Sequence, residues 1–60
     1  MNVVALHKTS LYVYNLINVD SITKTGDTIA VHGVPASAPS SGATTISFSA
    51  ADYLVSIVAN

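Results

Sequence analysis

Short apolar runs, separated by turn-forming residues, divide this chain into segments of strand length. Residues 2–7 form the first run, which ends at the polar residues 8–10. Residues 11–24 follow and begin with tyrosine and β-branched side chains, which suit a pleated sheet. Tyr12 and Tyr14 are two positions apart, so their rings lie on the same face of a strand. The pattern predicts two consecutive strands.

The alternation of inward and outward positions slips twice within the second predicted strand. Tyr14 and Leu16 have one parity, whereas the apolar Val19 has the other, and Ile22 returns to the first. Because a slip of one residue turns every following side chain to the opposite face, we expect a β-bulge or bend around residues 15–18. A long, bent strand in so short a chain indicates a strongly curved sheet or a small barrel.

A hairpin is the clearest local signal. The turn is a Thr-Gly-Asp sequence at residues 25–27. Glycine tolerates the positive φ of a tight turn, and aspartate is a frequent turn residue. Ile29 and Val31 alternate with small or polar residues, as in a half-buried strand. The pattern predicts a strand over 28–33 that pairs with the end of the preceding one.

Residues 34–43 contain mainly proline, serine, alanine and glycine, and we expect a flexible loop there. This segment is longer than most connections between strands, so it is either a passive connector or a binding loop. Residues 44–49 then alternate again, with Ile46 and Phe48 on one side and hydroxyl side chains on the other. This alternation predicts a fourth strand.

The segment 49–60 is compatible with two structures. Ser49 and Asp52 resemble a helix-capping box, and Asp52, Ser56 and Asn60 would fall on one polar stripe of an amphipathic helix. The aromatic and β-branched residues favour a strand instead, over 54–59, after one helical turn at 50–53. We favour the turn followed by a strand, and the helix stays open as the alternative.

The favoured fold is therefore all-β, a small five-stranded curved sheet or barrel with one helical turn before the last strand. Its predicted strands lie at about 2–7, 11–24, 28–33, 44–49 and 54–59. Their order resembles that of the SH3-like barrel in sequence of elements and in size. The acidic loop and paired aromatic residues of SH3 peptide-binding domains are not found, so the resemblance implies no function. The alternative is α+β, a four-stranded sheet covered by a C-terminal helix.

Size and composition indicate association. Sixty residues make a single domain over 1–60, which buries only about 60% of the surface of its unfolded chain. Domains of this size usually depend on disulfides, a metal or oligomerisation, and this chain has no cysteine. Charged residues make up 8% of the chain, against roughly 25% in an ordinary domain. With a net charge of −1, little self-repulsion opposes contact between copies.

Catalysis and metal binding find little support in the sequence. Serine, histidine and aspartate all occur, but without a nucleophile-elbow motif. Asp27 fits a turn and Asp52 a cap, the structural roles that aspartate favours. His7 and His32 without further clustered ligands are an incomplete metal set. We expect no enzyme activity, no cofactor, no metal and no small-molecule substrate.

Nucleic acid and membranes are also poor candidates. Lys8 and Lys24 are the only basic side chains besides histidine, and affinity for phosphate depends mostly on lysine and arginine. Weak nucleic-acid binding through tyrosine stacking is the least favoured of our functional alternatives. The chain lacks a basic amphipathic face, an apolar run of membrane-spanning length and a signal-peptide pattern. We therefore expect a cytoplasmic location.

Interaction with protein is the remaining hypothesis. We expect a small structural or protein-interaction module that self-associates, because uncharged edge strands pair readily with other strands. The first and last strands are the candidate edges. The alternative is a compact binder or inhibitor of a host macromolecule, of the kind that phages and mobile elements carry, with loop 34–43 or the tyrosine face as its contact surface. Candidate interface residues are Val3, Val4, Leu6, Tyr12, Tyr14, Tyr53, Val55 and Ile57.

Overall fold

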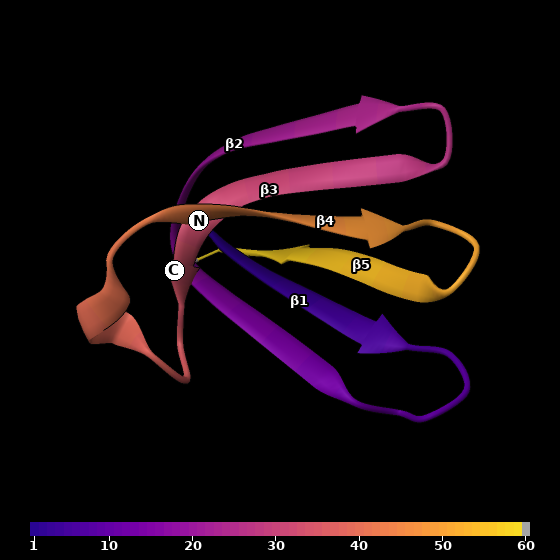
Figure 1. Ribbon diagram of the computed structural model, residues 1–60, viewed down its shortest axis with the longest axis horizontal. Coiled ribbons are helices and arrows are strands. Elements are labelled where there is room, and N and C mark those ends of the chain that lie inside the picture. The colour runs from indigo at the N-terminus through magenta and orange to yellow at the C-terminus, as the bar shows by residue number, and fades with distance from the viewer. Residues whose placement is uncertain (60) are drawn as a thin grey trace.

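The computed structural model describes residues 1–59, which form one antiparallel sheet of five strands. The elements are β1 (Asn2–His7), β2 (Val13–Thr25), β3 (Thr28–Pro35), the 3-10 turn η1 (Pro39–Ser41), β4 (Thr44–Ser49) and β5 (Tyr53–Val58). The strand order is β4-β3-β2-β1-β5. Figure 1 shows that the sheet curls: the first half of β2 lies beside β1 and the second half beside β3.

The all-β prediction is confirmed, but the sheet does not close into a barrel. Among the described residues, β4 pairs only with β3 and β5 only with β1. The turn at 50–52 explains this arrangement. The Ala50 N–H donates to the Asp27 carbonyl (2.6 Å), and the Lys8 N–H donates to the Asp52 carbonyl (2.8 Å). The two existing ladders therefore continue into the turn, and β4 and β5 remain as two open edges.

The C-terminal segment is a strand, so the alternative of a covering helix is wrong. The turn closes with a bond from the Asp52 N–H to the Ser49 carbonyl (3.0 Å). The six residues of β5 then pair with β1, from His7↔Tyr53 to Asn2↔Val58. The same pairing corrects our expectation that the first strand is an edge, because β1 has β2 on one side and β5 on the other.

The predicted irregularity in β2 is present, but it lies between Ile17 and Ser21, slightly later than the expected 15–18. Ile17 pairs with Val34 and Ser21 with His32, so four steps along β2 correspond to two along β3. Asn18 within this stretch has a φ of 51°. The additional residues form a bulge, which increases the local twist and bends the strand. This bend lets β2 take part in both halves of the curled sheet.

Gly33 lies opposite the bulge, inside β3, and not at the end of the strand as the sequence suggested. A Cβ atom on Gly33 would lie 2.7 Å from the Val19 Cγ2 and 3.1 Å from the Ile17 carbonyl oxygen. The Val19 N–H itself donates to the Met1 carbonyl (2.9 Å). The missing side chain thus allows β3 to approach the bulge closely.

Two other turns agree with expectation or refine it. Gly26 in the β2–β3 hairpin has a φ of 59°, which confirms the predicted hairpin, but Thr25 belongs to β2 and pairs with Thr28, so the turn is 26–27 and shorter than the predicted 25–27. The proline-rich connection is shorter than predicted, because β3 extends to Pro35. The remaining loop, 36–43, contains η1 and is held by a bond from the Ala36 N–H to the Asn15 carbonyl (2.9 Å).

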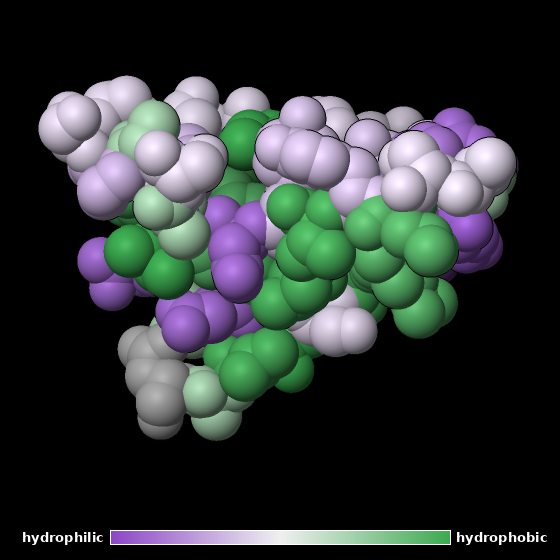
Figure 2. Space-filling model, turned by 90° about the horizontal axis from the view of Figure 1, so that it is seen from below, coloured by the Kyte–Doolittle hydropathy of each residue, from purple (hydrophilic) through white to green (hydrophobic). Residues whose placement is uncertain are grey.

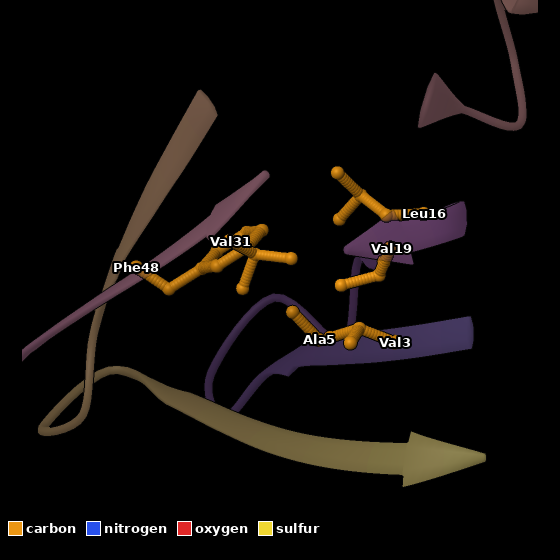
Figure 3. Packing of buried hydrophobic residues seen from close by; sticks show 6 residues of the cluster. All are labelled: Val3, Ala5, Leu16, Val19, Val31 and Phe48. Carbon is orange, nitrogen blue, oxygen red and sulfur yellow. The ribbon is translucent and has the colours of Figure 1, made fainter. Parts of the chain in front are cut away.

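The core lies on the inner face of the curled sheet. Its buried side chains point toward one another from four strands (Figure 3); they are Val3, Ala5, Leu16, Val19, Val31 and Phe48. Partly buried apolar residues pack around them: Ile22, Ile29, Ile46, Tyr53 and Val55. The core is small, which leaves several large apolar side chains of the strands outside it.

Candidate interaction surface

Within residues 1–59, the open edge of β5 presents backbone groups that no other strand pairs with. The bond between Lys8 and Asp52 is in register with the β1–β5 ladder, and hydrogen-bonded pairs alternate along an antiparallel ladder. Leu54, Ser56 and Val58 therefore direct their N–H and C=O groups toward β1. The corresponding groups of Val55 and Ile57 point away from β1, toward solvent. This edge can accept another strand.

The side chains on this edge are apolar on both faces of the sheet. Ile57 is 64% exposed, Leu54 is 58% exposed and Val58 is 44% exposed. β5 contains neither a charged residue nor a proline. Natural edge strands usually carry such residues, because they discourage pairing with other chains. The β5 edge lacks this protection.

The β4 edge differs in chemistry. Ile46 and Phe48 turn inward, and the alternate positions are the exposed Thr45 and Ser47. This edge also lacks charge and proline, but its outward side chains are hydroxyls. A partner strand would bury less apolar surface there than at β5.

The outer face beside β5 continues the apolar surface. Leu54 pairs with Leu6, and Leu6 pairs with Val13, so the three side chains form one row across β5, β1 and β2. Leu54 and Val13 are exposed, and Leu6 is half-buried. Figure 2 shows hydrophobic side chains, in green, gathered over the centre and right of the face seen from below. We call Leu6, Val13 and Leu54 the outer row.

An aromatic cluster occupies one end of the inner face. The Phe48 ring lies 5.1 Å from that of Tyr53 and 5.7 Å from that of Tyr14, measured between centroids. The Tyr12 ring lies 4.9 Å from Tyr14, and the His7 ring 4.9 Å from Tyr53. The rings are tilted or edge-on, which are favourable geometries. Phe48 is buried, whereas Tyr12 and Tyr14 are exposed.

A small pocket of about 120 Å³ lies beside this cluster. It lies where the start of β2 meets loop 36–43 and β4, and residues lining it include Tyr12, Tyr14, Leu16, Pro35, Ser37 and Ile46. The two surfaces that the sequence suggested for a macromolecular partner, the tyrosines and the proline-rich segment, therefore adjoin each other.

Among the described residues, one pair of ionisable side chains, Asp20 and His32, is in contact. The His32 Nδ1 lies 2.8 Å from the Asp20 Oδ1, and this hydrogen bond lowers the pKa of the exposed Asp20 carboxyl from its ordinary value of 3.8. The His7 Nδ1 accepts from the Ser10 N–H (3.1 Å). β2 separates the two histidine-bearing strands. Within residues 1–59, no three histidine, cysteine, aspartate or glutamate side chains gather as metal ligands would.

The predicted interface residues divide between core and surface. Val3 is buried in the core, so it offers no surface to a partner. Val4 and Leu6 are half-buried on the outer face of β1. The tyrosines belong to the aromatic cluster, in which the Tyr14 ring packs toward Phe48. Val55 and Ile57 lie on the inner face of β5, beside the open edge.

Sequence reasoning missed three exposed residues of this surface: Val13, Leu54 and Val58. The sequence does contain a signal for the residues in β5: Leu54 and Val58 are apolar at even positions, while Val55 and Ile57 are apolar at odd positions. A strand that is apolar at both parities has either two buried faces or a second face that remains exposed.

No known family model, curated protein or solved structure matches this chain. In the described part of the chain, no helix has the length and hydropathy needed to cross a membrane.

Proposed function

We propose that this protein is a small interaction module that self-associates through the open edge of β5 and the outer row beside it. The observation that carries the proposal is the β5 edge, which is apolar on both faces and has no charge or proline to prevent pairing. In this role the protein acts by binding rather than by catalysis.

The chemistry of the edge supports a reversible association. Full burial of a large aliphatic side chain is worth about 1.5–3 kcal/mol, so a half-exposed one gains about half of that on contact. Leu54, Ile57 and Val58 each supply such a gain in both copies. The total, about 4.5–9 kcal/mol, exceeds the lower end of the cost of association, about 4–15 kcal/mol, and the backbone hydrogen bonds between the two edges add to it. We therefore expect a dimer whose population depends on concentration.

Sedimentation equilibrium at micromolar to hundred-micromolar concentration tests the proposal. The wild-type mass should rise from 6.2 kDa toward twice that value, 12.4 kDa. Ile57→Lys places a charge on the open edge and should keep the chain at 6.2 kDa. Ser47→Lys, the matched control on the β4 edge, should behave as the wild type. A wild-type mass of 6.2 kDa at every concentration would rule out self-association.

The pocket beside the aromatic cluster favours a second candidate function, the binding of another macromolecule. Exposed tyrosines are rigid, amphipathic contact residues. Capture from a host lysate with the wild type and with Tyr12→Ser tests this function, with Ile57→Lys as control. A partner that the wild type and Ile57→Lys retain, and that Tyr12→Ser loses, supports it. Identical captures by all three variants oppose it.

A further inference from the structure

We infer that the partner at the β5 edge is a second copy of this chain, paired antiparallel so that Ser56 faces Ser56 of the partner subunit across a two-fold axis. The inference rests on the proposed self-association and specifies its geometry. It follows from the backbone groups that β5 leaves free and from the order of its side chains.

The free backbone groups restrict the possible pairings. Directly opposed residues in a sheet project to the same face, so residues of equal parity must face each other across the interface. The N–H and C=O groups of Val55 and Ile57 point toward the open edge. A symmetric antiparallel pair centred on β5 that uses these groups therefore has its axis at Ser56 or at Val55.

The axis at Ser56 matches the side chains. Leu54 then faces the partner's Val58 on the outer face, and Val55 faces the partner's Ile57 on the inner face. The two serines meet at the centre. Each exposed apolar residue of β5 gains an apolar neighbour, and the pairs of Val55 with the partner's Ile57 form two backbone hydrogen bonds each.

The axis at Val55 produces mismatches. Leu54 would then face the partner's Ser56, and Val58 would face the partner's Asp52. Two exposed apolar side chains would lie beside polar or charged ones, and less apolar surface would leave water. An axis at Leu54 or Ile57 shortens the overlap of the two strands. The register centred on Ser56 is the one in which the edge complements itself.

The outer row supports the same register. Leu54 already lies beside Leu6 and Val13 within one chain. With Val58 of the partner subunit opposite Leu54, the apolar row continues from one sheet into the next. The low charge of the chain, 8% of its residues, places no strong repulsion between the two copies.

A cysteine at the axis reports the register directly. The chain has no cysteine of its own. Opposed residues of a non-hydrogen-bonded pair have Cα atoms about 4.5 Å apart, within the range of a disulfide. Ser56→Cys should therefore form a covalent dimer under mild oxidation, at least about tenfold faster than a variant whose cysteines meet only by collision. Ser56 is exposed, so this substitution leaves the core intact.

Matched variants make the test specific. Ser47→Cys, on the exposed β4 edge, should dimerise slowly. Leu54→Cys alone should also react slowly, but a mixture of Leu54→Cys with Val58→Cys should yield the mixed dimer rapidly. Val55→Cys reacting faster than Ser56→Cys would move the axis by one residue and overturn the inferred register.

The outcomes separate this inference from the proposed function. If the wild type sediments as a dimer but Ser56→Cys reacts no faster than Ser47→Cys, the register is wrong and self-association stands. If the wild type also stays at 6.2 kDa, both proposals fail.

Discussion

Replacing Gly33 with alanine tests the reason for the bulge in β2. The added Cβ would lie 2.7 Å from the Val19 Cγ2, 3.1 Å from the Ile17 carbonyl oxygen and 3.2 Å from the Val19 Cα. Two of these three atoms belong to the backbone, and Val19 is buried in the core. The substitution therefore forces the bulge away from β3.

The change in the free energy of unfolding caused by Gly33→Ala is the difference between two opposing effects. Overpacking of a tight core contact costs about 1–3 kcal/mol. Alanine is better than glycine within a strand by about 0.5–1 kcal/mol, because the unfolded chain has less freedom to lose. We expect Gly33→Ala to lower the free energy of unfolding by about 1–2 kcal/mol. For a domain of this size, that loss lowers the melting temperature by roughly 5–15 °C.

A double-mutant cycle by urea denaturation provides the assay. Val19→Ala alone should cost about 1.6 kcal/mol, the value of two buried methylene equivalents. In the Gly33→Ala background, Val19→Ala should cost about 1 kcal/mol less. It removes the Val19 Cγ2 that clashes with the added Cβ, and that Cβ fills part of the space the valine methyl groups leave. Gly42→Ala, where φ is 78° and nothing lies near the added Cβ, should be destabilising without coupling to Val19. Additive effects of Gly33→Ala and Val19→Ala would refute the close-approach explanation.

Three further substitutions test other parts of the fold. Because the hydrogen bond with His32 lowers the pKa of Asp20 from 3.8, the pair should stabilise the protein above that pH and lose its effect as the pH falls below it. Urea midpoints of Asp20→Asn should therefore vary less with pH than those of the wild type between about pH 2 and 5, and parallel pH profiles would contradict this. Phe48→Ala should lower the free energy of unfolding by about 3–5 kcal/mol and leave the chain largely unfolded by circular dichroism. The control variant Phe48→Leu should remain folded. A folded Phe48→Ala would show that Phe48 is not central to the core. Leu11→Gly should raise the urea midpoint slightly. The exposed Leu11 has a φ of 60°, and this left-handed backbone conformation costs a residue with a side chain about 1–2 kcal/mol. A lower midpoint for Leu11→Gly would oppose this account.

Local patterns predicted most of the secondary structure. The turn at Gly26 and the alternation around Ile46 and Phe48 each depend on neighbours within a few residues, and both predictions are confirmed. The bulge was also predictable, because the shift in parity between Leu16 and Val19 has to be absorbed by the backbone. These features follow from the period of a single strand.

Pairing between distant strands was not predictable in the same way. The sequence of β1 is compatible with an edge or a central position, and only its pairing with β5 decides between them. The same pairing buries Val3 and leaves Leu54 exposed, although both are aliphatic residues in uncharged strands. Closure into a barrel likewise depends on the geometry of the whole sheet, since strand tilt and stagger must agree all around it.

The interaction surface was only partly predictable for a related reason. β5 is apolar at both parities, so its sequence does not reveal which side faces the core. The structure assigns Val55 to the inner side and Leu54 to the outer side. Gly33 gave no local signal of its role, because its neighbour Val19 lies fourteen positions away in the sequence.

Amide hydrogen exchange, followed by NMR at increasing protein concentration, tests the β5 interface most directly. In a single copy, the N–H groups of Val55 and Ile57 point to solvent, and they should exchange rapidly at low concentration. Pairing with a second copy should protect both amides as the concentration rises, while Thr45 and Ser47 on the β4 edge keep their rapid exchange. Rapid exchange of Val55 and Ile57 at every concentration, or protection of the β4 amides in their place, would contradict the assignment of β5 as the interface.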